Sequence, residues 1–136
     1  MKKLNFPILL IVLIISTFPS SMIVANYSDI SEEVTQAIRT GSSRDLARYF
    51  GSNVDLAIPG NDGTYSKAQA ELIMRNFFSD NRPESFEVNH KGTSRDGSPY
   101  VIGVYYTTDN KSYRTYFLIK KLSDNYFIHH LQFELQ

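Results

Sequence analysis

The sequence predicts an α+β domain in which a curved antiparallel β-sheet, a meander shaped like a cone, is covered by three helices. In the N-terminal and central parts, apolar residues recur at helical spacing in three segments. The C-terminal part instead holds four strand-like runs joined by short polar turns, which is typical of hairpin-linked strands. Stacking amphipathic helices on one face of such a sheet buries both apolar surfaces.

The first 25 residues predict a cleaved secretory signal. Lys2 and Lys3 precede an apolar run at 8–15, and a Ser, Thr and Pro break separates this run from a second apolar patch that ends at Ala25. A basic start, an apolar middle and a breaker are the parts of such a signal. An uncleaved anchor is the alternative, because the whole apolar stretch is near the shortest spanning length. We expect cleavage after Ala25, export to the periplasm or beyond, and membrane contact only through this segment.

Residues 26–136 have the size of one domain, and their composition excludes several functions. The chain has no Cys, so disulfides and Cys-ligated metals are excluded. Removing residues 1–25 leaves 12 basic against 14 acidic residues, a net charge of −2. Nucleic acid is not an expected partner, because its binding usually needs a basic stripe.

Three helices are expected, over residues 28–41, 42–51 and 66–80. Ser66 and Gln69 predict a capping box at the start of the third helix. The apolar face of this helix consists of Ala70, Ile73, Met74, Phe77 and Phe78. We expect this face to lie across the concave side of the sheet and to close the core.

Five strands are expected. Residues 53–58 alternate as a half-buried strand, and the segment NDG at 61–63 predicts a turn. The other four strands are SFEVNHKG at 85–92, PYVIGVYYT at 99–107, SYRTYFLIKKL at 112–122 and YFIHHLQFEL at 126–135. Strict alternation places His90 and His129 on the inner face of the sheet.

Four segments resemble an exported family of unknown function from Bacteroidota: AIRTGSSRDLARYF, DGTYSKAQAELIMRNFF, HKGTSRDGSPYVIG and YRTYFLIKK. The order of elements over residues 28–135 also resembles the nuclear transport factor 2-like superfamily, a cone of curved antiparallel sheet with helices over its mouth. The resemblance implies this fold and secretion across the inner membrane. It implies no activity, because such folds include isomerase and cyclase enzymes as well as non-catalytic binding and oligomerisation domains.

The inside of the cone is the first candidate site. We assign six residues to ligand binding there: His90, His129, Tyr49, Met74, Phe78 and Tyr106. The expected ligand is small and apolar. The alternative is a cone-pocket enzyme of the isomerase or hydrolase type that uses His90 with a Tyr donor. Because no Asp or Glu is expected on the inner face, we favour the non-catalytic interpretation and assign no catalytic residue.

A metal or a cofactor is not expected. His129 and His130 are adjacent on a strand, so their side chains point to opposite faces. His90 and His129 lie on the first and last strands of the meander, roughly 14 Å apart at about 4.8 Å per strand. The sequence contains no P-loop, no dinucleotide fingerprint and no nucleophile elbow.

The outer face of the sheet is the second candidate site. We assign four residues to an interface there: Tyr105, Tyr116, Leu118 and Ile128. An apolar patch of this kind exceeds what a soluble monomer normally exposes. The alternative is a set of scattered aromatics shielded by Lys120 and Arg114. Dimerisation of superfamily relatives through this face implies a homodimer, and another protein is the other partner to consider.

Overall fold

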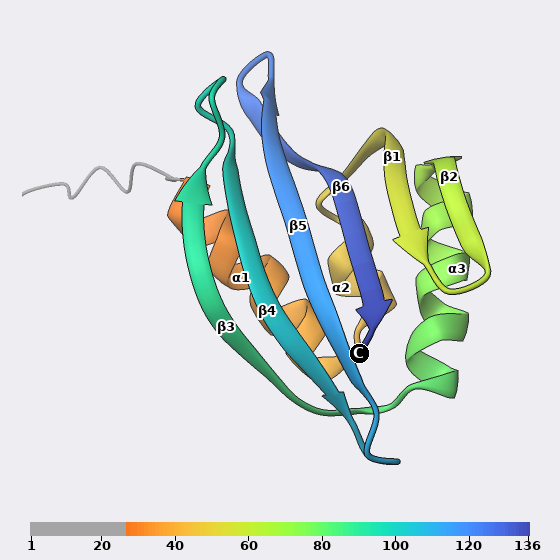
Figure 1. The fold of residues 1–136 in the computed structure, drawn as a ribbon. Helices are drawn as coiled ribbons and strands as arrows, with labels where there is room; N and C mark the ends of the chain where they lie inside the picture. Colours follow the sequence, from red (N-terminus) through yellow and green to blue (C-terminus); the bar gives the residue numbers. More distant parts are fainter. Residues whose placement is uncertain (1–26) are drawn as a thin grey trace, which may run out of the picture.

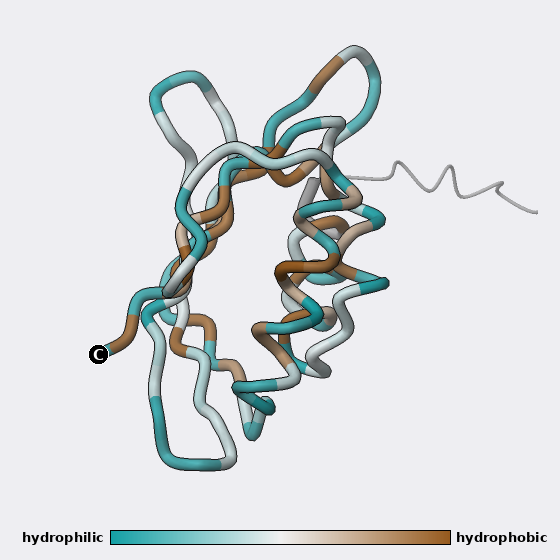
Figure 2. Tube along the Cα trace, turned by 90° about the vertical axis from the view of Figure 1, so that its right-hand side faces the viewer, coloured by the Kyte–Doolittle hydropathy of each residue, from teal (hydrophilic) through white to brown (hydrophobic). Residues whose placement is uncertain are grey.

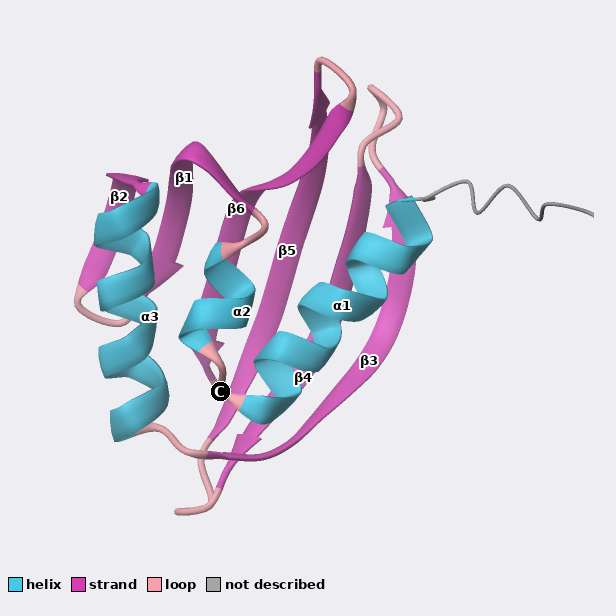
Figure 3. Cartoon of the chain, turned by 180° about the vertical axis from the view of Figure 1, so that it is seen from behind, coloured by secondary structure: helices cyan, strands magenta, loops and turns pink. Residues whose placement is uncertain are grey.

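The structure, a computed structural model, describes residues 27–136, so the predicted signal at 1–25 lies outside the described residues. The elements follow in this order: α1 (Tyr27–Thr40), α2 (Ser43–Ala47), β1 (Phe50–Ile58), β2 (Asn61–Ser66), α3 (Lys67–Asp80), β3 (Pro83–Thr93), β4 (Pro99–Thr107), β5 (Ser112–Leu122) and β6 (Asn125–Leu135). The three helices cover one face of a single curved, unclosed sheet (Figure 1, Figure 3). The predicted α+β class is confirmed. None of the described helices has the length and apolar character needed to cross a membrane.

The sheet has the strand order β2-β1-β6-β5-β4-β3. Strands β3 to β6 form the predicted antiparallel meander. β1 joins β6 in parallel and forms a hairpin with β2. The prediction of a turn at 61–63 is therefore wrong: the turn lies at 59–60, and residues 61–63 begin β2. This edge strand reads NDGTYS, and its single large apolar residue, Tyr65, gives no visible alternation.

The helix ends follow the local sequence. α1 ends at Gly41, which has φ of 66°, and the Ser42 N–H donates to the Ala37 carbonyl at 2.9 Å. This left-handed glycine closes the helix because it carries no Cβ. The predicted capping box of α3 is confirmed: the Gln69 N–H donates to Ser66 Oγ at 3.3 Å, and Gln69 Oε1 accepts from the Ser66 N–H at 3.1 Å.

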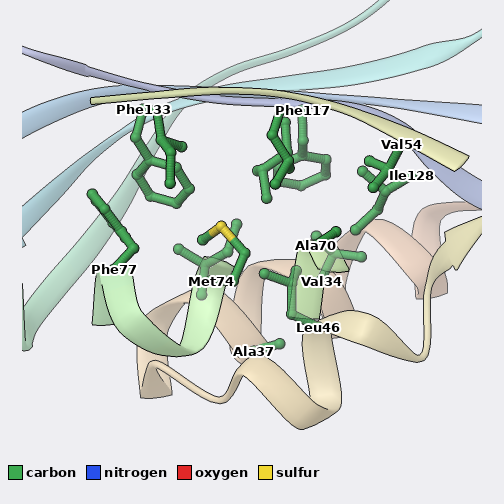
Figure 4. Close-up of a cluster of buried hydrophobic side chains, with 14 of the residues drawn as sticks. Val34, Ala37, Leu46, Val54, Ala70, Met74, Phe77, Phe117, Ile128 and Phe133 are labelled. Atoms are coloured by element: carbon green, nitrogen blue, oxygen red, sulfur yellow. The ribbon is translucent and has the colours of Figure 1, made fainter. Parts of the chain in front are cut away.

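The core lies between the two layers, which Figure 2 shows from the side. α3 buries Ala70, Met74, Phe77 and Phe78 against it. The Phe77 ring lies 4.7 Å from the Phe133 ring, centroid to centroid, and the close-up shows side chains of the helices and the sheet meeting there (Figure 4). The expected role of α3 in closing the core is confirmed.

Candidate functional site

The space in which the sequence predicts a ligand pocket is filled by core side chains. Met74 has no exposed surface, and Phe78 is 5% exposed. The Phe78 ring lies 6.0 Å from the Tyr105 ring and 6.3 Å from the Phe133 ring, centroid to centroid. Met74 and Phe78 therefore do not line an open pocket between the layers, because large aromatic side chains from the sheet occupy that space.

One polar cluster lies in this core, at the C-terminal end of α3. The Tyr105 hydroxyl donates to the backbone oxygen of Asn81 at 2.6 Å, and the Tyr113 hydroxyl donates to Asn81 Oδ1 at 2.8 Å. Burial raises the pKa of Tyr105, and the neighbouring Tyr113 adds to the effect. The assignment of Tyr105 to the outer face is wrong, since the residue is fully buried. β4 is apolar on both faces, so its sequence does not reveal which face is inner.

His90 lies on the outer face, contrary to the prediction. On β3, Val88 pairs with Gly103 and His90 pairs with Ile102, which leaves Asn89 as an extra residue. Because side chains alternate with a period of two, this bulge turns His90 away from the helices. The His90 ring is exposed, and its Nε2 lies 3.2 Å from the Tyr100 hydroxyl. His90 is therefore not available for chemistry inside the cone.

A second bulge, in β6, changes which residues of this strand face the core. Ile128 pairs with Ile119 and His130 pairs with Leu118, so that His129 is the extra residue. Ile128, predicted at the outer interface, is fully buried in the core. His129, predicted inside the cone, is exposed and lies on the other side of the sheet, with Nε2 3.9 Å from Asp55 Oδ2.

Of the last two predicted ligand residues, Tyr106 lies outside the cone, whereas Tyr49 is half-buried and packs against the core. Tyr106 is 36% exposed and follows the buried Tyr105 along β4, which places it on the outer face. Tyr49 lies between α2 and β1, and its backbone oxygen accepts from the Ile128 N–H at 2.6 Å. The structure thus does not bring the six predicted ligand residues together. Within residues 27–136, no cluster of three or more acidic and histidine side chains could hold a metal ion.

The outer face carries an ordered arrangement of side chains instead. The rings of His90, Tyr100, Tyr116 and His130 come from four successive strands, β3 to β6, and form what we call the aromatic row. Neighbouring ring centroids are 5.7, 5.9 and 5.7 Å apart along this row. Such spacings are typical of aromatic pairs in contact. The sequence pattern places Tyr116 and His130 on this face, whereas Tyr100 was not assigned to it. The row itself was not predicted, because it depends on the register between strands.

Half-buried aliphatic residues surround the aromatic row. We use the name outer patch for the row together with Ile102, Val104 and Leu118. Leu118 thus lies on the predicted face. Partial burial raises the pKa of Tyr116, and the neighbouring Tyr100 adds to this effect, which keeps the phenol neutral. The outer patch faces away from the helices, on the side of the sheet that Figure 1 shows in front.

Tyr100 occupies its place because the neighbouring strand has a glycine there. A Cβ atom at Gly92 would lie 2.6 Å from Tyr100 Cζ, closer than any stable contact, so the ring lies directly over the bare backbone of β3. This position brings the Tyr100 hydroxyl to His90. A glycine covered by an aromatic ring on a neighbouring strand is a recurrent device of curved sheets.

Comparisons with known proteins agree with this architecture. The family model for a domain of unknown function (DUF4783) matches residues 31–134. A DUF4783 family protein from Bacteroides uniformis, with a solved structure, is 36% identical over 79% of this chain and 97% of that chain, with a TM-score of 0.72. Another, from Bacteroides ovatus, is 35% identical over 76% of this chain and 93% of that chain, with a TM-score of 0.70. No curated protein matches the sequence.

A more distant solved structure shows the fold alone. This protein, Rd1NTF2_04 with long sheet, is 17% identical over 79% of this chain and 99% of that chain, with a TM-score of 0.62. Together with the two Bacteroides structures, it confirms the nuclear transport factor 2-like architecture. It carries no information on what this chain binds.

Proposed function

This chain belongs to the DUF4783 family of domains of unknown function. We propose that it is an exported, non-catalytic interaction domain that associates with a second copy through the outer patch. The observation that carries the proposal is the aromatic row, with its contacts from His90 through Tyr100 and Tyr116 to His130. Export rests on the basic and apolar pattern of residues 1–25.

The outer patch has a physical reason to be covered. Its aliphatic and aromatic side chains lie on one face of four adjacent strands, so their exposed surfaces form one continuous area. Leaving such area in water forgoes about 25 cal/mol for each Å² of apolar surface that could be buried. Continuous apolar patches on a protein surface are commonly interaction sites. The cone interior offers no comparable surface, because core side chains fill it.

Strand register supports a second copy as the partner. Consider a two-fold axis that lies between the two copies and runs across the strands at the level of Tyr116. This axis places each outer side chain of one copy over a residue of the same strand in the other copy, at the same distance from the axis but on its opposite side. By the pairing of β5 and β6, this operation places Glu134 of one copy over His130 of the other. By the pairing of β4 and β5, it places Val104 over Tyr100. The same operation places Leu118 over Arg114. It thus brings Glu134 within reach of an imidazole N–H and packs an aliphatic side chain on an aromatic one, contacts that a closed two-fold dimer repeats on both sides of its axis.

The test is light scattering of residues 26–136 over a concentration series. We expect the weight-average mass to rise with concentration for the wild type and to stay monomeric for Leu118→Lys, which would bury an unpaired charge at the contact. Leu72→Lys is the matched control, because Leu72 is 52% exposed on α3, on the helix side of the sheet, and should leave association unchanged. A wild type that stays monomeric at high micromolar concentration contradicts the proposal.

A further inference from the structure

A groove on the helix side of the molecule has a different character from the outer patch. Residues from the junction of α1 and α2 and from the C-terminal half of α3 line it, and its volume is about 570 Å³. Figure 3 shows these elements on the helix side of the sheet. Sites for small molecules usually measure about 300–1,000 Å³. A second pocket, on the opposite side of α3, measures about 170 Å³ and falls below this range. The size of the larger groove is therefore sufficient for a small ligand.

The floor of this groove is apolar and firmly held. Phe78 and Pro83 line it, and Phe78 is 5% exposed because its other side packs into the core. A Cβ atom at Gly41 would lie 2.9 Å from Pro83 Cγ, so the backbone of Gly41 packs directly on the proline. Gly41 also has φ of 66°, which a residue with a side chain rarely adopts. The floor thus offers a preformed apolar surface.

The rim of the groove carries two guanidinium groups and no carboxylate. Arg75 and Arg82 both line it. The Arg75 side chain is 63% exposed, and its Nη2 lies 3.8 Å from Glu71 Oε1, a distance at which an exposed ion pair contributes little. The Arg82 side chain is exposed and has no hydrogen bond or ion pair with any residue from 27 to 136. Both cations are therefore available to an incoming anion.

Apart from Glu71, which pairs weakly with Arg75, the carboxylates next to the lining residues are directed elsewhere. Asp109 follows the lining residue Thr108, and its Oδ2 lies 3.4 Å from Lys111 Nζ. Asp80 follows the lining residue Ser79 but lines the small pocket on the opposite side of α3. The groove therefore keeps an excess of positive charge, although residues 26–136 carry a net charge of −2.

We propose that this groove binds a small amphipathic carboxylate. The guanidinium groups of Arg75 and Arg82 hold the carboxylate, and the floor formed by Phe78 and Pro83 supports its hydrocarbon part. Guanidinium groups suit this task because their planar N–H donors match the two oxygens of a carboxylate. The hydroxyl of Ser79, on the same wall of the groove as Arg75, adds a neutral donor.

The test uses hexanoate, acetate, hexylamine and inorganic phosphate as probes of residues 26–136, with amide chemical shifts as the readout. Hexanoate should shift the amides of Gly41, Ser79 and Thr108 in a saturable way. Acetate should bind at least about tenfold more weakly, because it lacks the methylene groups that the floor covers. Inorganic phosphate should bind as weakly as acetate, for the same reason. Hexylamine, which has the same chain and the opposite charge, should not bind.

Two substitutions locate the binding. Arg82→Gln should weaken hexanoate binding about tenfold, since a hydrogen bond to a charged group is lost. Arg95→Gln is the matched control, because Arg95 is exposed in the hairpin between β3 and β4, at the other end of β3 from Arg82, and should not change the affinity. The proposal is overturned if hexanoate causes no saturable shifts, if hexylamine binds equally well, or if Arg82→Gln binds like the wild type. Tighter binding of phosphate than of hexanoate would also overturn it, because the floor would then have no role.

Discussion

The hydroxyl of Tyr113 donates a hydrogen bond of 2.8 Å to the side-chain oxygen of Asn81, a residue 32 positions earlier in the chain. The backbone oxygen of Asn81 accepts a second hydrogen bond, of 2.6 Å, from Tyr105. The side-chain nitrogen of Asn81 donates to the Phe77 carbonyl at 3.1 Å and so satisfies the last turn of α3. One residue thus fixes the end of α3 to two neighbouring strands.

Asn81→Ala should lower the free energy of unfolding by about 1–3 kcal/mol, because it leaves the Tyr113 hydroxyl without its acceptor in a partly buried place. Urea denaturation measures this loss. Asn76→Ala, the same change at an exposed position of α3, should stay within about 0.5 kcal/mol of the wild type. Equal stability of the two variants would show that the cluster around Asn81 does not hold α3 in place.

Phe77→Ala should lower the free energy of unfolding by about 3–5 kcal/mol, the range for removing a large aromatic side chain from a core. Phe77 is 5% exposed, and its ring contacts those of Tyr113 and Phe133 at 5.3 and 4.7 Å. Leu72→Ala on the exposed side of the same helix should cost less than about 1 kcal/mol. A small loss for Phe77→Ala would mean that α3 does not cover the core.

The sequence was sufficient to predict the elements that bury a regular apolar face. α3 shows its apolar stripe and its capping box directly, and β5 alternates so regularly that Tyr116 and Leu118 were correctly placed on the outer face. The edge strand β2 was missed because it pairs with a neighbour on only one side and buries little. Its residues are mostly polar, as suits an edge strand, so they show no alternation of apolar and polar side chains.

The candidate site was harder to predict, because it depends on two bulges. One extra residue at Asn89 and another at His129 reverse the alternation of β3 and β6. Neither residue type indicates a bulge, and each reversal moves a histidine from the predicted inner face to the outer face. The contact between Tyr100 and Tyr116 likewise depends on the register between β4 and β5, which single-strand patterns do not contain.

Asp96 should make the domain lose stability as the pH falls into the acid range. The Ser94 hydroxyl, the Ser98 hydroxyl and N–H, and Lys120 hold the pKa of Asp96 below its usual range. A carboxyl with a lowered folded-state pKa stabilises the folded protein fully above its unfolded pKa of about 3.9, and this contribution is lost progressively as the pH falls from that value through the lower folded-state pKa.

Asp96→Asn should therefore be less stable than the wild type at pH 7, and the two should converge as the pH falls below about 4. Urea denaturation midpoints at pH 7, 5 and 3 measure the difference. Asp124→Asn, in the exposed turn between β5 and β6, is the control and should show no such convergence. A constant difference between Asp96→Asn and the wild type at all three pH values would argue against the charge of Asp96 as its cause.

Residues 1–25 should be absent from the exported protein. Intact-mass measurement of protein from the cell envelope should give a chain that begins at Asn26, because the basic and apolar pattern before Ala25 predicts a cleaved signal. Leu13→Arg should block export, since a charge interrupts the apolar run. A full-length species held firmly in membranes would instead support the uncleaved anchor.

Gly92→Ala should disturb the outer patch without disturbing the core. The added Cβ would lie 2.5 Å from the Tyr100 hydroxyl oxygen and 2.6 Å from Cζ, so the ring must turn away and lose its contact with His90. The backbone of β3 can accept alanine, because Gly92 is not among the glycines with positive φ.

Self-association of the Gly92→Ala variant should weaken about tenfold, the usual effect of displacing one aromatic contact residue. In a Tyr100→Ala background the clash is absent, so Gly92→Ala should then change association little, and a double-mutant cycle measures this coupling. If Gly92→Ala weakens association equally in both backgrounds, the position of Tyr100 over the glycine is not what shapes the interface.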